Sequence, residues 1–373
     1  MTIIIIFFIR EKMAFTSRFS KGKITQCKRL AFEKLKNTGL EYNGTIFGGF
    51  VRDEYISEYY TNKYNKDHSN DNNKISKYWD AKYSPETSSR LLIPSDMDIS
   101  FKTQQEADEF IAAVQNIPEF SKVSVNRENI NDYYRSIQSS LESIQRVCID
   151  MHFGREPFLH RGRLIRIGID VVIPYSKTLE APFGNLDMLC NGFILTKEGK
   201  RFSKNTGTII DMYTDYERAV VTPQIIRDML DFKTYICMAN RFERQTINIT
   251  AFNRILKITS KNKPWTILNM PYTRETYKLS DSKEECCICS DEFANNDEIA
   301  YTSIQNDKND LIATSAKMHN RCLMRYLLHQ KNDYDEFNVE NPNKVFCFKC
   351  PMRNTITFTR CKLDIQFAYK TEM

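Results

Sequence analysis

Two aspartates, Asp96 and Asp98, stand two residues apart inside the apolar run LLIPSDMDISF. Residues i and i+2 of a β-strand point to the same face, so we expect these two carboxylates side by side. Like charges on an otherwise buried strand repel each other and are costly to desolvate, so a positive partner is expected. A divalent cation meets this need, because Mg²⁺ prefers one or two carboxylates together with substrate phosphates. The alternative is a strand end in solvent, where both aspartates cap a turn.

Two further aspartates are candidates for a third metal ligand. Asp170 lies in the middle of the apolar run LIRIGIDVVIP, and Asp150 has a similar setting in QRVCIDMHF. Both runs have the length and composition of β-strands. We favour Asp170 because its strand is the more continuous one. The alternative for either aspartate is a salt bridge to Arg161, Arg163 or Arg166.

Two adjacent glycines open the stretch GGFVRD, directly after a short apolar strand at residues 45–47. A strand, two glycines, a helix, a strand with Asp-x-Asp and a later strand with Asp form an order that resembles the nucleotidyltransferase superfamily of DNA polymerase beta type. The resemblance is closest to the poly(A)-polymerase and CCA-adding branch, over roughly residues 40–215. The motifs GG-x-V-R-D and D-x-D of that branch are matched by Gly48, Gly49, Val51, Arg52, Asp53, Asp96 and Asp98.

This resemblance implies a role for each matched residue. Gly48 and Gly49 would let the backbone approach the phosphates of a nucleoside triphosphate, with the positive N-terminus of the next helix behind them. The Asp-x-Asp pair, joined by Asp170, would bind Mg²⁺ or Mn²⁺ for an in-line displacement. Arg52 and Asp53 would help to place the nucleotide. The motifs that specify tRNA or mRNA are not visible, so the resemblance does not name the acceptor.

The cysteines of the C-terminal part are clustered, since seven of the 11 lie beyond residue 285. Three ligand pairs have the x₂ spacing that lets both members reach one tetrahedral zinc ion at about 2.0–2.3 Å. These pairs are Cys286–Cys289, His319–Cys322 and Cys347–Cys350. Zinc binding is therefore the expected chemistry of this segment, and a small domain with few apolar residues needs such a metal to fold.

The order of these pairs resembles a RING finger, with C-x-I-C at the start and H-x-x-C-L-x-x-Y-L in the middle. In that family, ligand pairs one and three share the first zinc ion, which makes Cys286, Cys289, His319 and Cys322 a complete set. Pair two is missing, because Ser315 and Lys317 stand at its positions. The second site would keep only Cys347 and Cys350, with Cys361 as a further candidate. The resemblance implies a ubiquitin-conjugating enzyme as partner, contacted through Ile288 and the PMR stretch, and a plain protein-binding or RNA-binding zinc module is the alternative.

Composition limits the class of protein. The net charge of +6 over 373 residues permits contact with RNA but does not argue for it. Four single cysteines scattered before residue 285 are typical of an intracellular, cytoplasmic protein. The apolar start MTIIIIFFIR is shorter than the about 20 residues of a membrane span, so no membrane is expected, and either Met1 or Met13 is the true start. The Asn- and Lys-rich style is similar to proteins of giant DNA viruses, which would place the chain in the host cytoplasm or the virion.

The predicted fold class is α+β, with a nucleotidyltransferase-type mixed sheet, flanking helices, a helical segment and a small zinc-stabilised RING-like domain. The expected domains are an N-terminal extension and helix, a nucleotidyltransferase-like domain containing a polar surface insertion, a helical segment with a linker, the RING-like domain and a tail. Their respective ranges are 1–39, 40–215 (insertion 57–90), 216–275, 283–355 and 356–373. The predicted function is metal-dependent transfer of a nucleotide from a nucleoside triphosphate to an RNA 3′ end or a protein hydroxyl. The alternative is an inactive scaffold of the same fold, whose RING-like tail acts in ubiquitin transfer or protein binding.

Overall fold

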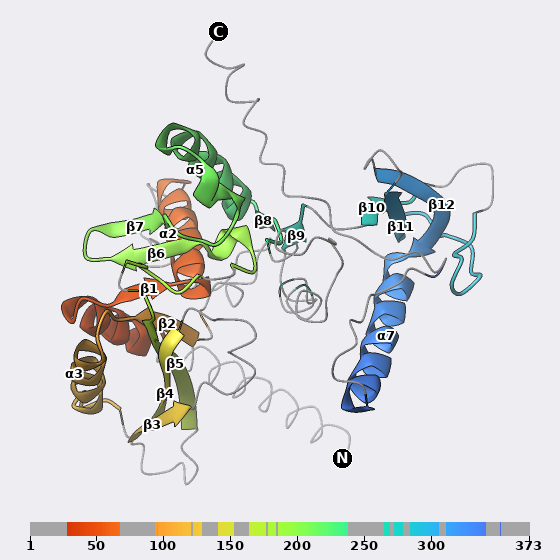
Figure 1. Ribbon diagram of the computed structural model, residues 1–373. Coiled ribbons are helices and arrows are strands. Elements are labelled where there is room, and N and C mark those ends of the chain that lie inside the picture. Colours follow the sequence, from red (N-terminus) through yellow and green to blue (C-terminus); the bar gives the residue numbers. More distant parts are fainter. Residues whose placement is uncertain are drawn as a thin grey trace, which may run out of the picture. The chain divides into compact units, whose positions relative to one another are not determined.

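The computed structural model divides the chain into two compact units, each described by itself below (Figure 1). Unit 1 comprises Met1–Leu186 and Cys190–Tyr213, and unit 2 comprises Asp187–Leu189 and Thr214–Met373. The residues that the structure describes are 28–67, 94, 96–120, 122–128, 141–152, 164–176, 178–183, 186–237, 255, 258, 265–268, 272–278, 284–305, 311–340 and 351.

The described part of unit 1 is built on a seven-stranded mixed sheet with the strand order β3-β4-β5-β2-β1-β6-β7. Strands β2 and β5 are parallel, and every other neighbouring pair is antiparallel. The strands are β1 (Thr45–Phe47), β2 (Asp96–Ser100), β3 (Lys122–Glu128), β4 (Leu141–His152), β5 (Leu164–Pro174), β6 (Phe193–Thr196) and β7 (Gly199–Phe202). The predicted α+β class with a mixed sheet is confirmed.

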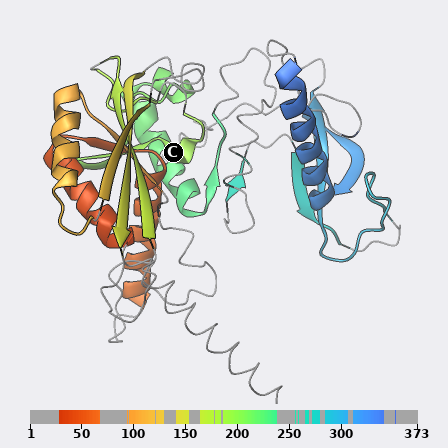
Figure 2. The same cartoon turned by 90° about the horizontal axis from the view of Figure 1, so that it is seen from below.

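One face of this sheet carries the core of unit 1. Met97 and Ile99 of β2 are fully buried, whereas Asp96 is exposed, so the strand alternates as its sequence predicts. A helix at residues 28–41, α2 (Gly49–Asp67) and α3 (Gln104–Gln115) pack here (Figure 2). The capping box of Thr103 and Glu106 starts α3 directly after β2, and burial of the apolar stripe of α3 then holds it against the sheet.

Helix α2 differs from the sequence prediction in its length. It begins at Gly49, directly after β1, and continues to Asp67. The first eleven residues of the predicted polar insertion, 57–67, are therefore helical, and Ser57 and Thr61 within them are buried. The polar composition concealed this, because a helix anchored by the buried residues Phe50, Val51 and Ile56 extends through polar ones at little cost. Residues 68–90 lie outside the described part of the chain.

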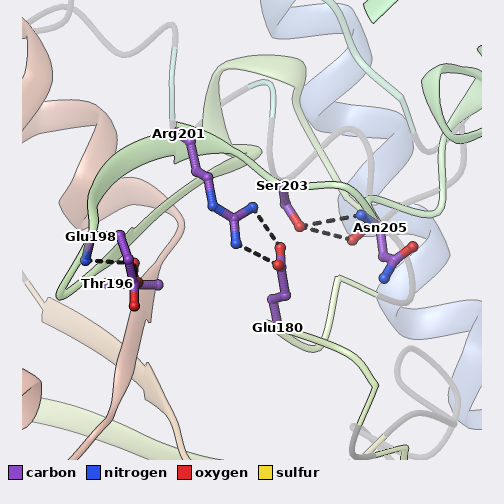
Figure 3. Close-up of polar contacts among 6 residues, drawn as sticks. All are labelled: Glu180, Thr196, Glu198, Arg201, Ser203 and Asn205. Atoms are coloured by element: carbon purple, nitrogen blue, oxygen red, sulfur yellow. Dashed lines mark hydrogen bonds and ion pairs between the residues drawn. The ribbon is translucent and has the colours of Figure 1, made fainter. Parts of the chain in front are cut away.

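A short segment after β5 is attached to the β6–β7 hairpin. Arg201 on β7 pairs with both carboxylate oxygens of Glu180, with 2.7 Å between Nη1 and Oε2 (Figure 3). This ion pair lowers the pKa of Glu180 mainly through its hydrogen bond. Three residues further on, the ring of Phe183 meets that of Phe47 edge to face at 5.4 Å. The segment thereby lies beside the end of β1 that leads into the glycine turn.

Unit 2 contains α5 (Asp215–Leu230), β8 (Lys233–Thr234) and β9 (Thr266–Ile267), and the two strands pair in parallel. The predicted helical segment is interrupted at Lys233–Thr234, where the chain is extended, and Ile255 and Ile258 are helical again, whereas the other residues of 238–264 lie outside the described part of the chain. Along the chain, two 3₁₀ turns precede α5, namely η3 (Leu189–Asn191) and η4 (Ile209–Met212), and η4 belongs to unit 1. Among the described residues, no helix is both long and apolar enough to cross a membrane.

The C-terminal part of unit 2 forms an antiparallel sheet in the order β10-β11-β12, followed by a helix. These elements are β10 (Tyr272–Thr276), β11 (Glu298–Gln305), β12 (Leu311–His319) and α7 (Asn320–Glu340). The sequence predicted a linker where β10 lies. That prediction was wrong, because β10 pairs with β11. The strand was not recognised in the sequence because it has few apolar residues and because β11 follows it by more than twenty residues.

Candidate functional site

The four residues of the predicted first zinc site come together. The ligand atoms of Cys286, Cys289, His319 and Cys322 all lie within 4.8 Å of one another. The Nδ1 atom of His319 lies 3.4 Å from the sulfur of Cys289 and 3.9 Å from that of Cys322. Ligand atoms around a tetrahedral zinc ion at about 2.0–2.3 Å lie roughly 3.5 Å from each other. The set of donors and their spacing therefore fit zinc.

Local structure brings the four ligands to one point. Cys286 and Cys289 lie in a tight turn, which Ser290 closes by donating its N–H to the carbonyl of Cys286 at 2.8 Å. Ser290 adopts a φ of 60°, the left-handed conformation that such a turn requires. His319 is the last residue of β12, and Cys322 lies in the first turn of α7. The x₂ spacing works at both places because each pair spans a single turn of backbone.

The surroundings of Cys286 favour its thiolate form. Burial alone raises the pKa of this thiol, but backbone N–H groups of Cys289, His319 and Ile288 outweigh burial and lower the pKa to about 6. The N–H of His319 lies 3.3 Å from the sulfur. Since metal ligation requires the thiolate, these donors favour metal binding.

The structure also shows the contacts of Lys317, which stands at one position of the missing second ligand pair. The Nζ atom of Lys317 lies 2.8 and 2.9 Å from the two carboxylate oxygens of Glu284. A lysine in this ion pair is a cation and cannot coordinate zinc. The remaining residues predicted for the second site, Cys347 and Cys350, lie outside the described part of the chain.

The predicted carboxylate site is only partly assembled. Asp98 and Asp170 are register partners on the parallel strands β2 and β5, and Asp96 pairs in the same way with Gly168. Gly48, with φ of +77°, lies beside Asp98, because a Cβ atom added there would be 3.4 Å from Asp98 Oδ2. The glycine turn, Asp98 and Asp170 thus follow one another across three neighbouring strands.

Asp170 is paired with an arginine other than the three that were expected. Arg146 on β4 donates to both its carboxylate oxygens, at 2.9 Å from Nε and 3.2 Å from Nη2. Asp150 is held in the same way by Arg166, at 2.9 and 3.3 Å, which is the salt bridge left open as its alternative. Within the residues described, the Cys/His cluster is the one group of three or more possible ligands whose atoms all lie within 4.8 Å of one another. The carboxylate oxygens of Asp96, Asp98 and Asp170 therefore do not all lie that close together.

Arg52 and Asp53 make contacts within the protein. Arg52 Nε lies 2.7 Å from Asp53 Oδ1, and Arg52 Nη1 lies 2.8 Å from the side-chain oxygen of Asn191 in η3. Both side chains of the Arg–Asp pair are nearly buried, at 13% and 11% exposed. Burial lowers the pKa of Arg52, but Asp53 and Cys190 outweigh this and raise it. The pair links the first turn of α2, which follows the glycine turn, to η3. Nothing in the sequence predicted that Asn191 would contact Arg52.

No protein-family model, no curated protein and no solved structure matches this chain. Function must therefore be inferred from the two sites themselves.

Proposed function

We propose that this chain is a metal-dependent nucleotidyltransferase that moves a nucleotide from a nucleoside triphosphate to a hydroxyl acceptor, an RNA 3′ end or a protein side chain. One observation carries the proposal. The carboxylate of Asp98 lies between the Gly48 turn, from which α2 starts, and its register partner Asp170.

This arrangement suits a triphosphate bound with a cation. Gly48 has a backbone conformation that a side chain would strain, and the absence of a Cβ leaves room beside Asp98. The first backbone N–H groups of α2 start at Gly49, and the N-terminus of a helix favours phosphate. Asp96, Asp98 and Asp170 would hold Mg²⁺ or Mn²⁺, which supplies activation of the attacking hydroxyl and charge stabilisation of the leaving pyrophosphate.

The buried Arg52–Asp53 pair supports this function indirectly. Arg52 is bound to both Asp53 and Asn191, which ties the start of α2 to η3. These contacts restrain the glycine turn from which α2 starts. A turn that binds phosphate through backbone groups gains affinity when it is rigid before binding. Arg52 therefore acts as a support for the turn in this proposal, while the backbone makes the phosphate contacts.

The Cys/His cluster would hold one zinc ion that stabilises the C-terminal module. A structural zinc ion bound by such a set contributes on the order of 10–16 kcal/mol. With its RING-like order of ligands, the module would bind a protein partner such as a ubiquitin-conjugating enzyme.

A second function, a scaffold without transferase activity, is favoured by the ion pair of Asp170. Arg146 already neutralises this carboxylate through two hydrogen bonds, so a cation would have to displace the guanidinium to reach it. A protein in which that exchange never occurs would keep the fold and lose the chemistry, and the zinc module would then carry the function.

One experiment separates the two. The purified full-length protein is incubated with each labelled nucleoside triphosphate, Mg²⁺ or Mn²⁺ and a mixed RNA pool, next to the variants Asp98→Asn and Asp150→Asn. Asp150 is the control, because it is an aspartate of the same sheet, on β4, that lies outside the proposed site and is held by Arg166. Transfer to RNA or to the protein itself that is lost in Asp98→Asn but kept in Asp150→Asn supports the transferase. No transfer by the unaltered protein to any acceptor supports the scaffold.

A further inference from the structure

The histidine of the Cys/His cluster is held from both sides of its ring. Only 3% of His319 is exposed. Its Nδ1 atom faces the sulfurs of Cys289 and Cys322, while its Nε2 atom lies 3.2 Å from Oδ2 of Asp297. Asp297 belongs to none of the ligand pairs with x₂ spacing.

Asp297 is itself fixed by the backbone around it. It lies directly before β11, and its Oδ2 atom accepts the N–H of Ala294 at 2.8 Å. Its carbonyl accepts the N–H of Tyr277 at 2.8 Å, and Asn296 beside it turns the chain with a φ of 70°. The carboxylate therefore has little freedom to move away from the imidazole.

Aromatic packing limits the histidine ring as well. Phe293 meets the ring of His319 edge to face, with 4.9 Å between centroids and 74° between planes. Phe293 packs in turn on Tyr277 at 5.1 Å. A 180° flip of the ring would put Cε1 and Cδ2 where Nε2 and Nδ1 now lie, so both the contact with Asp297 and the approach to the sulfurs would be lost.

We propose that Asp297 is a positioning residue for the metal, which keeps His319 in the form that binds zinc through Nδ1. A neutral imidazole carries one proton, and only the nitrogen without it can ligate a metal. A carboxylate that accepts the proton of Nε2 leaves the lone pair of Nδ1 free for the ion and makes that nitrogen a better donor. This inference rests on the zinc proposal above, and it adds a residue that ligand spacing does not reveal.

The size of the effect follows from the role. Removing the carboxylate partner of a metal-ligating histidine typically weakens metal affinity about 10- to 100-fold. The four ligands remain in Asp297→Ala, so zinc should still bind, but more weakly by that factor. In Asp297→Asn the amide oxygen can still accept the N–H of Ala294, which preserves the turn, while the negative charge facing His319 is gone. An intermediate loss is expected there.

Glu298→Ala is the matched control. Glu298 is the next residue, carries the same charge, and contacts the side chain of Asn320 at the start of α7 at 2.6 Å. A general effect of negative charge near the site would weaken zinc equally in both variants. A positioning effect would be confined to Asp297.

The test is zinc affinity of the full-length chain, measured for the first equivalent by competition with a coloured chelator. Cobalt replaces zinc in parallel samples, because its visible spectrum reports how the histidine is bound. We expect a 10- to 100-fold loss for Asp297→Ala, a smaller loss for Asp297→Asn and a change within about twofold for Glu298→Ala. The cobalt spectrum should change in the Asp297 variants, while the far-ultraviolet circular dichroism of the loaded protein stays the same.

Three results would overturn the inference. Unaltered affinity and an unaltered cobalt spectrum in Asp297→Asn would show that the carboxylate does not act on the metal, even if Asp297→Ala failed to fold. An equal loss in Glu298→Ala would assign the effect to general charge. If the unaltered protein bound no zinc at all, the zinc proposal itself would fail, which is a different outcome from equal binding by all variants.

Discussion

Replacing Arg146 with glutamine tests whether Asp170 belongs to a metal site. Arg146 occupies both carboxylate oxygens of Asp170, at 2.9 and 3.2 Å. A divalent cation that uses Asp170 must first displace this guanidinium. Arg146→Gln removes the competing charge and retains a polar side chain, so Mn²⁺ should bind more tightly to the variant than to the unaltered protein.

The magnitude follows from the geometry and exposure of the pair. The two side chains are 39% and 24% exposed, so solvent screens the interaction and most of its Coulomb energy is lost. Partly exposed pairs contribute about 0–1 kcal/mol, and bidentate charge-assisted geometry places this one at the upper end. Because each 1.4 kcal/mol changes an affinity tenfold, release of about 1 kcal/mol should tighten Mn²⁺ binding roughly fivefold.

The assay is titration of Mn²⁺ followed by the electron paramagnetic resonance signal of the free ion, in the absence of nucleotide. Arg166→Gln is the control, since Arg166 holds Asp150 through the same two atoms at 2.9 and 3.3 Å. Both variants lose one positive charge from neighbouring strands, so their difference isolates the direct competition at Asp170. Equal tightening in the two variants would remove Asp170 from the site, and weaker binding in Arg146→Gln would refute the competition altogether.

Three further outcomes are expected. Asp96→Ala should lower nucleotide transfer by orders of magnitude while the thermal midpoint holds or rises, because it removes one charge from a group of like charges. Cys289→Ser should lose zinc by elemental analysis and make the chain from about residue 283 sensitive to protease, whereas Cys350→Ser should do less, and two tightly held zinc ions per chain would show that ligands of the second site were missed. The Arg201 pair lowers the pKa of Glu180 from 4.5, so its contribution is present above that pH and disappears as pH falls through the lower folded-state value. The stability difference between the unaltered protein and Arg201→Gln should therefore shrink between pH 7 and pH 3, and a difference that does not depend on pH would contradict this.

Local patterns in the sequence were enough to predict part of both sites. The alternation of strand side chains predicted that Asp96 and Asp98 share a face, and the buried Met97 between them fits that pattern. The x₂ spacing predicted both halves of the zinc cluster, because two ligands separated by two residues lie within one turn and can reach the same ion. In each case the prediction needed only a few consecutive residues.

Contacts that depend on strand register could not be predicted in this way. Arg146 and Asp170 face each other because β4 and β5 pair in one register, and a shift by one residue would separate them. The arginines expected as partners were Arg161, Arg163 and Arg166, which follow β4 in the sequence, whereas Arg146 lies within β4 itself. The same limit applies to Asp297, which reaches His319 only because the turn before β11 lies beside the end of β12.

The two sites stabilise their negative charge in different ways, and this difference bears on how each would hold a metal. At Asp170 the compensating charge is a side chain of the protein, so a cation competes with Arg146 and gains little unless it brings other ligands. Mg²⁺ commonly does so, since it is bound through one or two carboxylates together with the phosphates of the substrate. At Cys286 the partners are N–H donors that favour the thiolate, and a metal can bind without displacing them. Zinc should therefore remain bound through purification, whereas the carboxylate site should bind its cation weakly until a triphosphate is present, and metal affinity there should rise when nucleotide is added.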